Sequence, residues 1–524
     1  MSLSEVEMKE SHMYRDDVED FCGFRPGLAT LSERRAAMSG SEVALVYLGD
    51  QITYREVHSR VLIRAAALAA AGVGKGDRVA YLGENHPALI ETMLAVVRIG
   101  GVFLPLNNRL THNELHYQLT DSAASALILG PERCADSESF ADASFIVDVA
   151  VWSPDPVAAP AIAVPAAQVG GTDPAFLLYT SGTTGRPKGA ILSHENLLWN
   201  SFNLMLDVDV RSDEVALVSA PMFHVAALNQ LVVTVYLKGG RSVIAPKWDA
   251  DLALDLIESH GVTWMFGVAT MFADLTNSAR WAHTDLASIR SVMSGGAPIP
   301  RHLIDLYMEK GITFCQGYGL TETAPGATFM PQHESVRKAG SAGAQVMFDE
   351  VMIVDADGTE CPPGTTGEII IRGPNVSTGY WRNPAATATA FSDGGWFHSG
   401  DIGYRDTEGF FFIVDRLKDM YISGGENVYP AEVEAVLFEH PDVAEAAVIG
   451  MPDDRWGEVG HAFVVSHEDA LINVSEVQEF ASTRLARYKV PKRITVVPRL
   501  PRTGSGKVRK TALRSDATHE ASVR

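Results

Sequence analysis

A segment rich in glycine and hydroxyl groups carries the strongest chemical signal in this sequence. Residues 180–189 read Thr-Ser-Gly-Thr-Thr-Gly-Arg-Pro-Lys-Gly and lie between the apolar runs 176–179 and 190–192. Backbone N–H groups, hydroxyls and a lysine that converge at short range suit a polyphosphate. The segment is not a Walker A loop, because Lys188 is followed by glycine instead of serine or threonine. The pattern therefore predicts a phosphate-binding loop of another kind; a plain turn between strands is the alternative for the segment taken alone.

Two further segments follow strands that the sequence predicts at 289–293 and 312–315. They read Ser294-Gly-Gly-Ala-Pro298 and Gln316-Gly-Tyr-Gly-Leu-Thr-Glu322. Open α/β sheets bind ligands outside the carboxyl ends of their strands. A tyrosine at 318 offers a flat face to a base, and a glutamate at 322 offers a hard oxygen ligand to Mg²⁺. The glycine pair is a weak signal by itself, but together the two segments predict a nucleotide site.

The elements that must position these segments alternate between short apolar runs and helical periods from about residue 50 to 335. We expect, for example, strands at 78–82 and 102–106 around a helix at 88–99, which follows a proline suited to a first helical turn. Such alternation is typical of an α/β fold with parallel strands joined by helices. Beyond residue 340 the pattern changes to paired strands, which predict a small β subdomain, and after residue 416 to a compact α+β unit with a helix at 430–438.

Composition limits the partners and the compartment. The chain has 524 residues, too many for one core, and a formal net charge of −22, which disfavours nucleic acid and anionic lipid. The four cysteines, Cys22, Cys134, Cys315 and Cys361, lack metal-ligand spacing and predict buried thiols of a reduced compartment. Without a signal peptide or a long apolar run, we expect a cytoplasmic protein with no stable membrane insertion. A homodimer is only the default oligomer.

Five segments in order resemble the core motifs of the adenylate-forming superfamily, which includes acyl-CoA synthetases, adenylation domains and luciferases. They are residues 180–189, 317–322, 396–401, 415–430 and 501–507, and the resemblance extends from about residue 30 to 513. It implies a large N-terminal domain, residues 1–417, of layered α/β subdomains with a β-rich part at about 340–415. It also implies a small mobile α+β domain, residues 418–524, with a hinge near Lys418.

The same resemblance implies roles for individual residues. The β- and γ-phosphates of ATP would contact Thr180, Ser181, Gly182, Thr183, Thr184, Gly185 and Lys188, with Mg²⁺ beside Thr180 and Glu322. The rest of the nucleotide would contact Gly296, Ala297, Pro298, Gln316, Gly317, Tyr318, Gly319, Thr321, Asp401 and Arg416. Lys507 would bridge the substrate carboxylate and the α-phosphate, and His224 would lie beside the acyl pocket. The pantetheine of CoA would pass Ser423, Gly424 and Gly425.

The implied activity is an AMP-forming acyl-CoA ligase that uses ATP, Mg²⁺ and CoA. A carboxylate and a triphosphate repel each other, so a lysine and Mg²⁺ are needed to hold them in line. The branch resembled most is that of bacterial fatty-acid–CoA ligases, so a medium- or long-chain fatty acid is the first expectation and a hydroxycinnamic acid such as ferulate is the alternative.

Each of these residues taken alone also has a purely structural interpretation. Lys507 could be a solvated lysine, Glu322 a carboxylate at a helix N-terminus, Asp401 a turn residue and His224 a packing residue. A non-catalytic nucleotide-binding regulator would belong to another functional class, and it would need a damaged motif. The motif residues Lys188, Glu322, Asp401, Arg416 and Lys507 are all in place.

Overall fold

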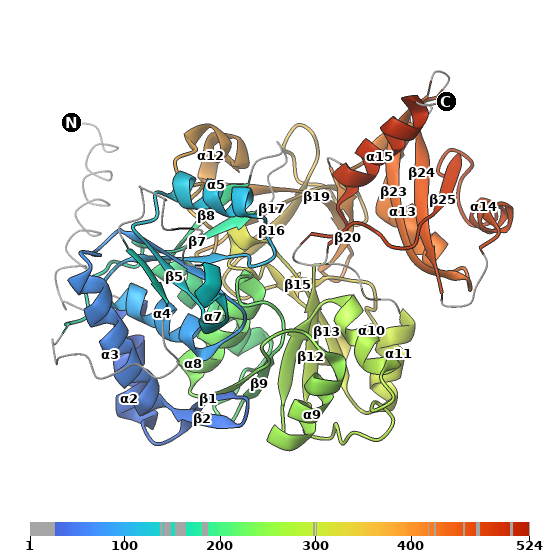
Figure 1. Cartoon of the computed structure of the whole chain (residues 1–524). Helices are drawn as coiled ribbons and strands as arrows, with labels where there is room; N and C mark the ends of the chain where they lie inside the picture. Colours follow the sequence, from blue (N-terminus) through green and yellow to red (C-terminus); the bar gives the residue numbers. More distant parts are fainter. Residues whose placement is uncertain are drawn as a thin grey trace, which may run out of the picture.

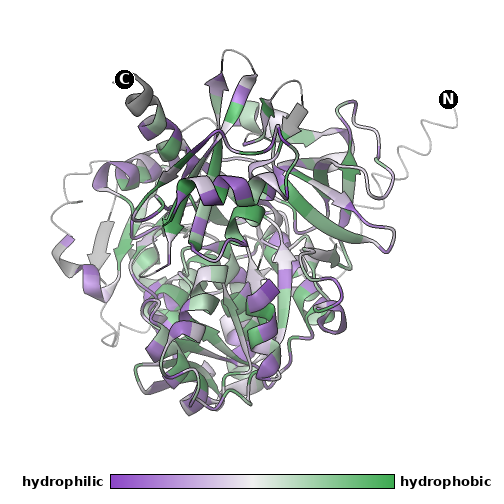
Figure 2. Cartoon of the chain, turned by 90° about the vertical axis from the view of Figure 1, so that its right-hand side faces the viewer, coloured by the Kyte–Doolittle hydropathy of each residue, from purple (hydrophilic) through white to green (hydrophobic). Residues whose placement is uncertain are grey.

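The computed structural model of the chain describes residues 27–136, 140, 148–151, 164–180, 187–296, 299, 301–417, 419–423, 426–453, 456–467, 472–503 and 507–522. Figure 1 shows a large body, coloured blue to yellow, and a smaller orange and red body beside it. Apolar residues lie mainly on the strands and polar residues on the outer helices and loops (Figure 2). The predicted α/β fold with a large N-terminal and a small C-terminal domain is confirmed.

The first sheet has six strands. Its order is β6 (Asp148–Val151), β5 (Ala126–Leu129), β3 (Arg78–Leu82), β4 (Val102–Leu106), β7 (Pro174–Thr180) and β8 (Lys188–Ser193). All neighbours are parallel except β7 and β8, which are antiparallel. β7 and β8 are antiparallel because residues 181–187 are too few for a crossover helix. The predicted phosphate loop therefore connects two antiparallel strands, β7 and β8, which we call the phosphate hairpin.

The second sheet joins the rest of the large body. Its parallel part consists of β1 (Val43–Tyr47), β10 (Arg241–Ile244), β9 (Val215–Val218), β11 (Trp264–Gly267), β12 (Ser291–Gly295) and β13 (Thr313–Tyr318). An antiparallel strand β2 (Asp50–Thr53) covers one edge. Beyond β13 follow, in ladder order, β14 (Thr328–Phe329), β15 (Gly343–Gln345), β20 (Phe410–Arg416), β19 (Trp396–Arg405), β17 (Gly367–Arg372) and β16 (Glu350–Val354), with β18 (Phe391–Ser392) beside β19. The predicted β subdomain thus has its own apolar cluster but continues the ladder of the α/β sheet.

The helices of the large body cover the two sheets. They are α2 (Leu31–Ser39), α3 (Tyr54–Ala70), α4 (Pro87–Arg98), α5 (His112–Ser122), α7 (His194–Asp207), the π-helix η3 (Ala226–Val233), α8 (Thr234–Lys238), α9 (Ala250–His260), α10 (Ala269–Asn277), α11 (Arg301–Glu309) and α12 (Pro384–Ala390). Short 3₁₀ turns lie at Leu28–Thr30, Pro131–Asp136, Thr321–Thr323 (η4), Gln332–Glu334 and Asp393–Gly395. Every residue of α4 is buried, and its Glu91 pairs with Arg64 of α3 at 2.5 Å. This internal ion pair compensates two charges that burial would otherwise leave uncompensated.

The C-terminal body has its own sheet and core. Its strands are β22 (Glu426–Val428), β21 (Tyr421–Ser423), β24 (Gly457–Ser466) and β23 (Val443–Asp453), with β25 (Arg493–Val496) parallel to β24. Its helices are α13 (Pro430–Phe438), α14 (Val474–Ser482) and α15 (Lys510–Ser522). An apolar cluster around Tyr421, Val433 and Val464 fills the space between them. Lys418, the predicted hinge, lies outside the described residues, so the domain boundary stays a prediction.

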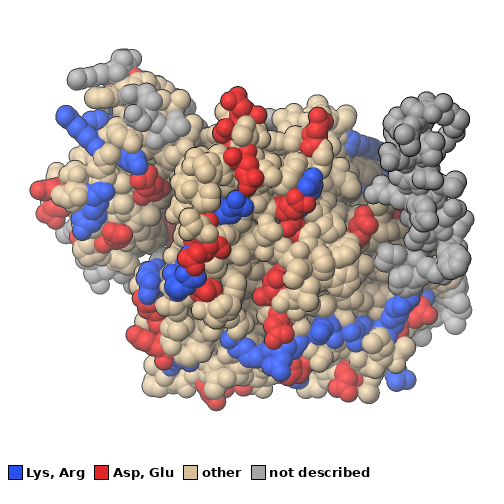
Figure 3. Space-filling view, turned by 180° about the vertical axis from the view of Figure 1, so that it is seen from behind, with Lys and Arg blue, Asp and Glu red and all other residues tan. Residues whose placement is uncertain are grey.

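The structure also describes two of the cysteines, the character of the helices and the distribution of surface charge. Cys315 and Cys361 are buried free thiols, whereas the side chains of the other two cysteines lie outside the described part. None of the helices in the described ranges combines the length and the apolar character of a membrane-spanning segment. Acidic and basic side chains are interspersed on the face in Figure 3.

Candidate functional site

Two predicted segments meet at the carboxyl ends of neighbouring parallel strands. Ser294 and Gly295 of β12 are in register with Gln316 and Gly317 of β13. The Gln316 side-chain oxygen accepts a hydrogen bond from the backbone of Ile299 at 3.2 Å, which ties the chain after β12 to β13. The structure therefore brings together segments that the sequence placed separately, at the edge where such sheets bind ligands.

Close backbone approaches explain the glycines after β13. A Cβ atom at Gly319 would lie 1.6 Å from the carbonyl oxygen of Pro325, and one at Gly317 would lie 2.9 Å from the ring of Phe329. The turn η4 that follows carries Thr321 and Glu322. The Thr323 hydroxyl holds it, donating to the carbonyl oxygen of Pro325 at 2.8 Å and accepting from the backbone of Leu320 at 2.9 Å. The turn is thus rigidly built.

The phosphate hairpin places its two described ends side by side. Thr180 at the end of β7 pairs with Lys188 at the start of β8. The Lys188 ammonium lies 5.2 Å from the ring centroid of Tyr380, within cation–π range. Several predicted contacts lie outside the described residues: Ser181, Gly182, Thr183, Thr184, Gly185, Ala297, Pro298, Gly424 and Gly425.

Glu322 is buried, with 7% of its surface exposed, and its carboxylate has a defined partner. Its Oε1 accepts a hydrogen bond from the Tyr380 hydroxyl at 2.7 Å. Burial and the charge of Glu322 raise the pKa of the Tyr380 phenol, so the hydroxyl stays protonated and donates. Sequence analysis missed Tyr380, because no local pattern relates it to a glutamate 58 residues away.

The two side chains that the resemblance assigns to Mg²⁺, Glu322 and Thr180, are chemically suited to this ion. Among the described residues, no cluster of three His, Cys, Asp or Glu side chains could hold a metal by itself. Mg²⁺ commonly takes one or two protein oxygens and completes its shell with substrate phosphates and water. The Glu322 carboxylate and the Thr180 hydroxyl are such hard oxygen donors, and phosphates would have to supply the rest.

A second side-chain hydrogen bond joins Asp401 of β19 to Tyr318 of β13. Asp401, only 4% exposed, accepts a hydrogen bond from the Tyr318 hydroxyl at 2.8 Å, although the two residues are 83 positions apart. Asp401 is also in register with Arg416 of β20, whose side chain is outside the description. The carboxylate that the resemblance assigns to the ribose therefore lies beside the tyrosine assigned to the base.

Lys507 lies close to Gly296, and its charge acts on His224. A Cβ atom built at Gly296 would be 3.4 Å from Cε and 3.8 Å from Nζ of Lys507. Burial, and then the positive charges of Lys507 and Arg109, lower the pKa of His224 to about 4. His224 is thus neutral at pH 7 and cannot supply a positive charge to a carboxylate, whereas Lys507 can. Ser423, assigned to CoA, is buried on β21 and pairs with Glu426.

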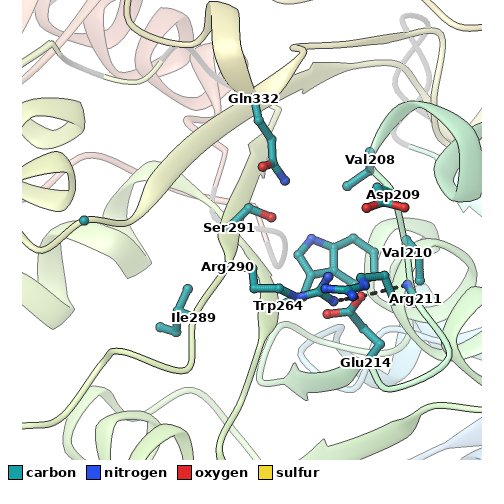
Figure 4. A pocket seen from close by; sticks show the side chains of 11 residues that line it. Val208, Asp209, Val210, Arg211, Glu214, Trp264, Ile289, Arg290, Ser291 and Gln332 are labelled. Carbon is teal, nitrogen blue, oxygen red and sulfur yellow. Dashed lines mark hydrogen bonds and ion pairs between the residues drawn. The ribbon is translucent and has the colours of Figure 1, made fainter.

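The cavity in Figure 4 lies elsewhere, at the amino ends of β11 and β12. It has a volume of about 380 Å³ and is lined by, among others, Trp264, Arg290 and Glu214. Arg290 pairs with Glu214 at 2.5 Å, so the charges of this pair offset each other. The cavity is therefore separate from the edge where the predicted segments meet.

Comparison with protein families identifies the class. The profile of the AMP-binding enzyme family matches residues 32–381, and that of the AMP-binding enzyme C-terminal domain matches residues 432–507. The chain therefore belongs to the AMP-binding enzyme family, and the resemblance to adenylate-forming enzymes is confirmed.

The similar proteins include several CoA ligases and CoA synthetases. A feruloyl-CoA synthase of an Amycolatopsis species is 47% identical over 93% of this chain and 98% of its own. The long-chain-fatty-acid–CoA ligase FadD13 of Mycobacterium tuberculosis is 38% identical over 88% of this chain and 93% of its own. O-succinylbenzoate-CoA synthetase (MenE) of Bacillus subtilis, solved with ATP and magnesium, has a TM-score of 0.84 at 33% identity and covers 93% of this chain and 99% of its own. The chain is an AMP-forming acyl-CoA ligase, and the prediction of ATP, Mg²⁺ and CoA is confirmed at the level of the family.

Proposed function

We propose that the protein is an AMP-forming CoA ligase for a hydroxycinnamic acid such as ferulate. The observation that carries this proposal is the 47% identity to a feruloyl-CoA synthase over 93% of the chain, against 38% for the fatty-acid ligase. It reverses the order of the two acids that the sequence alone suggested.

A buried amide six residues after His224 in the chain favours an acid with polar ring substituents. Gln230 of η3 is 3% exposed, and its side-chain nitrogen donates to the sulfur of Met293 on β12. A thioether is a weak acceptor, so this amide would form a stronger hydrogen bond with an oxygen of the substrate. An alkyl chain would offer it no acceptor, and a buried polar group with a poor partner costs free energy.

In the first half-reaction, an oxygen of the acid attacks the α-phosphorus of ATP and pyrophosphate leaves. Lys507, beside Gly296, would hold the acid carboxylate against the α-phosphate and offset the charge that builds up there. Thr180, Lys188 and the hairpin tip would bind the leaving phosphates, while Tyr318 and Asp401 hold the nucleoside. Glu322 and Thr180 would hold Mg²⁺, which would supply positive charge to offset that of the phosphates.

In the second half-reaction, the CoA thiol gives its proton to water and attacks the acyl carbon; the bond between that carbon and the phosphate oxygen breaks, and AMP leaves as the thioester forms. The first attack is on the α-phosphorus and the second is on the acyl carbon, so the same carboxyl group needs different partners in the two steps. We propose that the C-terminal domain turns about Lys418 between them, which moves Lys507 away and brings Ser423, Gly424 and Gly425 to the pantetheine. Glycine suits such an approach because it has no side chain.

A long-chain fatty acid is the second candidate, and the identity to FadD13 favours it. The test is AMP and thioester formation with ferulate, 4-coumarate and benzoate and with C6 to C18 fatty acids. Pyrophosphate release that requires an acid separates either ligase from a nucleotide-binding regulator, which would bind ATP without turnover. Gln230→Leu should shift the preference from ferulate toward fatty acids, and an unchanged preference would contradict the role given to this amide.

A further inference from the structure

The segment Asn375–Trp381 pairs with the strand that leaves the phosphate hairpin. Tyr380 forms an antiparallel bridge with Ala190. The backbone N–H of Ile191 donates to Gly379 at 3.0 Å, and that of Trp381 donates to Gly189 at 2.8 Å. The backbone at Tyr380 is thereby fixed to β8, which begins with Lys188.

The same segment holds the turn that carries Glu322. The backbone N–H of Ser377 donates to the carbonyl oxygen of Glu322 at 2.7 Å. The Asn375 amide donates to the carbonyl oxygens of Thr323 at 2.8 Å and Gly326 at 2.6 Å. The segment therefore sets the spacing between the phosphate hairpin and the Glu322 turn.

The side chain of Tyr380 reaches the functional groups of both elements. Its hydroxyl donates to Oε1 of Glu322 at 2.7 Å, while its ring lies 5.2 Å from the Lys188 ammonium. Gly379 has a φ of +134°, and a Cβ atom there would lie 2.6 Å from Thr387, so glycine is required for this course of the chain. This hydrogen bond to Oε1 restricts the rotamer of the Glu322 side chain.

We infer that Tyr380 is a positioning residue, which orients Glu322 toward the metal and Lys188 toward the phosphates of a metal–nucleotide complex. The inference rests on the proposed function, since it takes Glu322 as a metal ligand. Its hydroxyl acts on the metal through Glu322, and its ring acts on the phosphates through Lys188, so the two contributions can be separated by mutation.

The test measures metal binding directly in the full chain with ATP and no acid. Free Mn²⁺ is followed by electron paramagnetic resonance, and ATP binding without metal by calorimetry. Tyr380→Phe should weaken Mn²⁺ binding about tenfold, as expected for the loss of a hydrogen bond to a charged group, and leave metal-free ATP binding and Tm unchanged. Tyr380→Leu should in addition weaken metal-free ATP binding, because it removes the ring beside Lys188. Tyr404→Phe, which removes a tyrosine hydroxyl from β19, is the control.

Unchanged Mn²⁺ binding in Tyr380→Phe would overturn the inference. So would a lower Tm with equal losses of metal-bound and metal-free ATP, because that would be a merely structural effect. Failure of the proposed function looks different: the wild-type protein would bind Mn²⁺ with ATP in a Tyr380-dependent way but form no acyl-CoA with any acid.

Discussion

Replacing Asp349 with asparagine should stabilise the protein above pH 7. Asp349 is 2% exposed, and its Oδ2 has no hydrogen-bond partner among the described residues. Burial raises its pKa from 3.8 to about 7, the charge of Asp207 adds to this, and the amides of Asn375 and Asn203 oppose it. The folded carboxyl thus keeps its proton up to about pH 7, whereas the unfolded one loses it near pH 4. Between about pH 4 and pH 7 the unfolded state therefore binds fewer protons than the folded state. As the pH rises through this range, Asp349 lowers the free energy of unfolding.

The magnitude follows from this window. Between pH 5 and the folded pKa near 7, two units at 1.36 kcal/mol each make about 2.7 kcal/mol. Asparagine keeps the acceptor for Asn203, which donates to Asp349 at 3.4 Å, but it cannot ionise. The stability of Asp349→Asn relative to wild type should therefore rise by about 2 to 3 kcal/mol from pH 5 to pH 8.

Urea titrations of both proteins at pH 5 and pH 8 measure this difference. Asp357→Asn, at an exposed turn, is the control and should show no such change. A difference between Asp349→Asn and wild type that stays constant within about 0.5 kcal/mol across this range would refute a buried, protonated Asp349.

Two further predictions concern the site. Lys507→Ala should lower acyl-adenylate formation at least about a hundredfold and spare thioester formation from supplied adenylate, since Lys507 lies beside Gly296 and acts in the first half-reaction. Lys510→Ala, which breaks the ion pair with Glu434, is the control. Equal loss of both half-reactions in Lys507→Ala would contradict the assignment. Asp401→Asn should raise the KM for ATP about tenfold with a smaller effect on the KM for the acid, because it removes a charged acceptor beside Tyr318; equal effects on both substrates would count against a ribose contact.

Local signals in the sequence predicted many elements well. The strands at 78–82 and 102–106 and the helix at 430–438 occur at the predicted residues, and Pro87 and Pro430 are each the first residue of a helix. The continuity of the β subdomain with the α/β sheet was not predictable, since β14 and β15 have only two and three residues and show no periodicity. The antiparallel pairing of β7 and β8 could have been inferred from the short segment between them.

The candidate site was predicted as segments, and the structure supplies their pairing. Tyr318 and Glu322 were found because they follow a strand and resemble a family motif. Their partners Asp401 and Tyr380 come from distant parts of the chain, and only the tertiary fold brings them together. The neutrality of His224 likewise depends on burial and on Lys507 from the other domain, which no local pattern contains.

The most direct test of the central claim is the rate of CoA-thioester formation, with AMP measured in parallel, for ferulate against the C6 to C18 fatty acids. The account predicts that kcat/KM for ferulate exceeds that of the best fatty acid by at least about tenfold, with one AMP formed per thioester. A maximum among the fatty acids would contradict the proposed acid, and ATP binding without turnover on any acid would contradict the ligase itself.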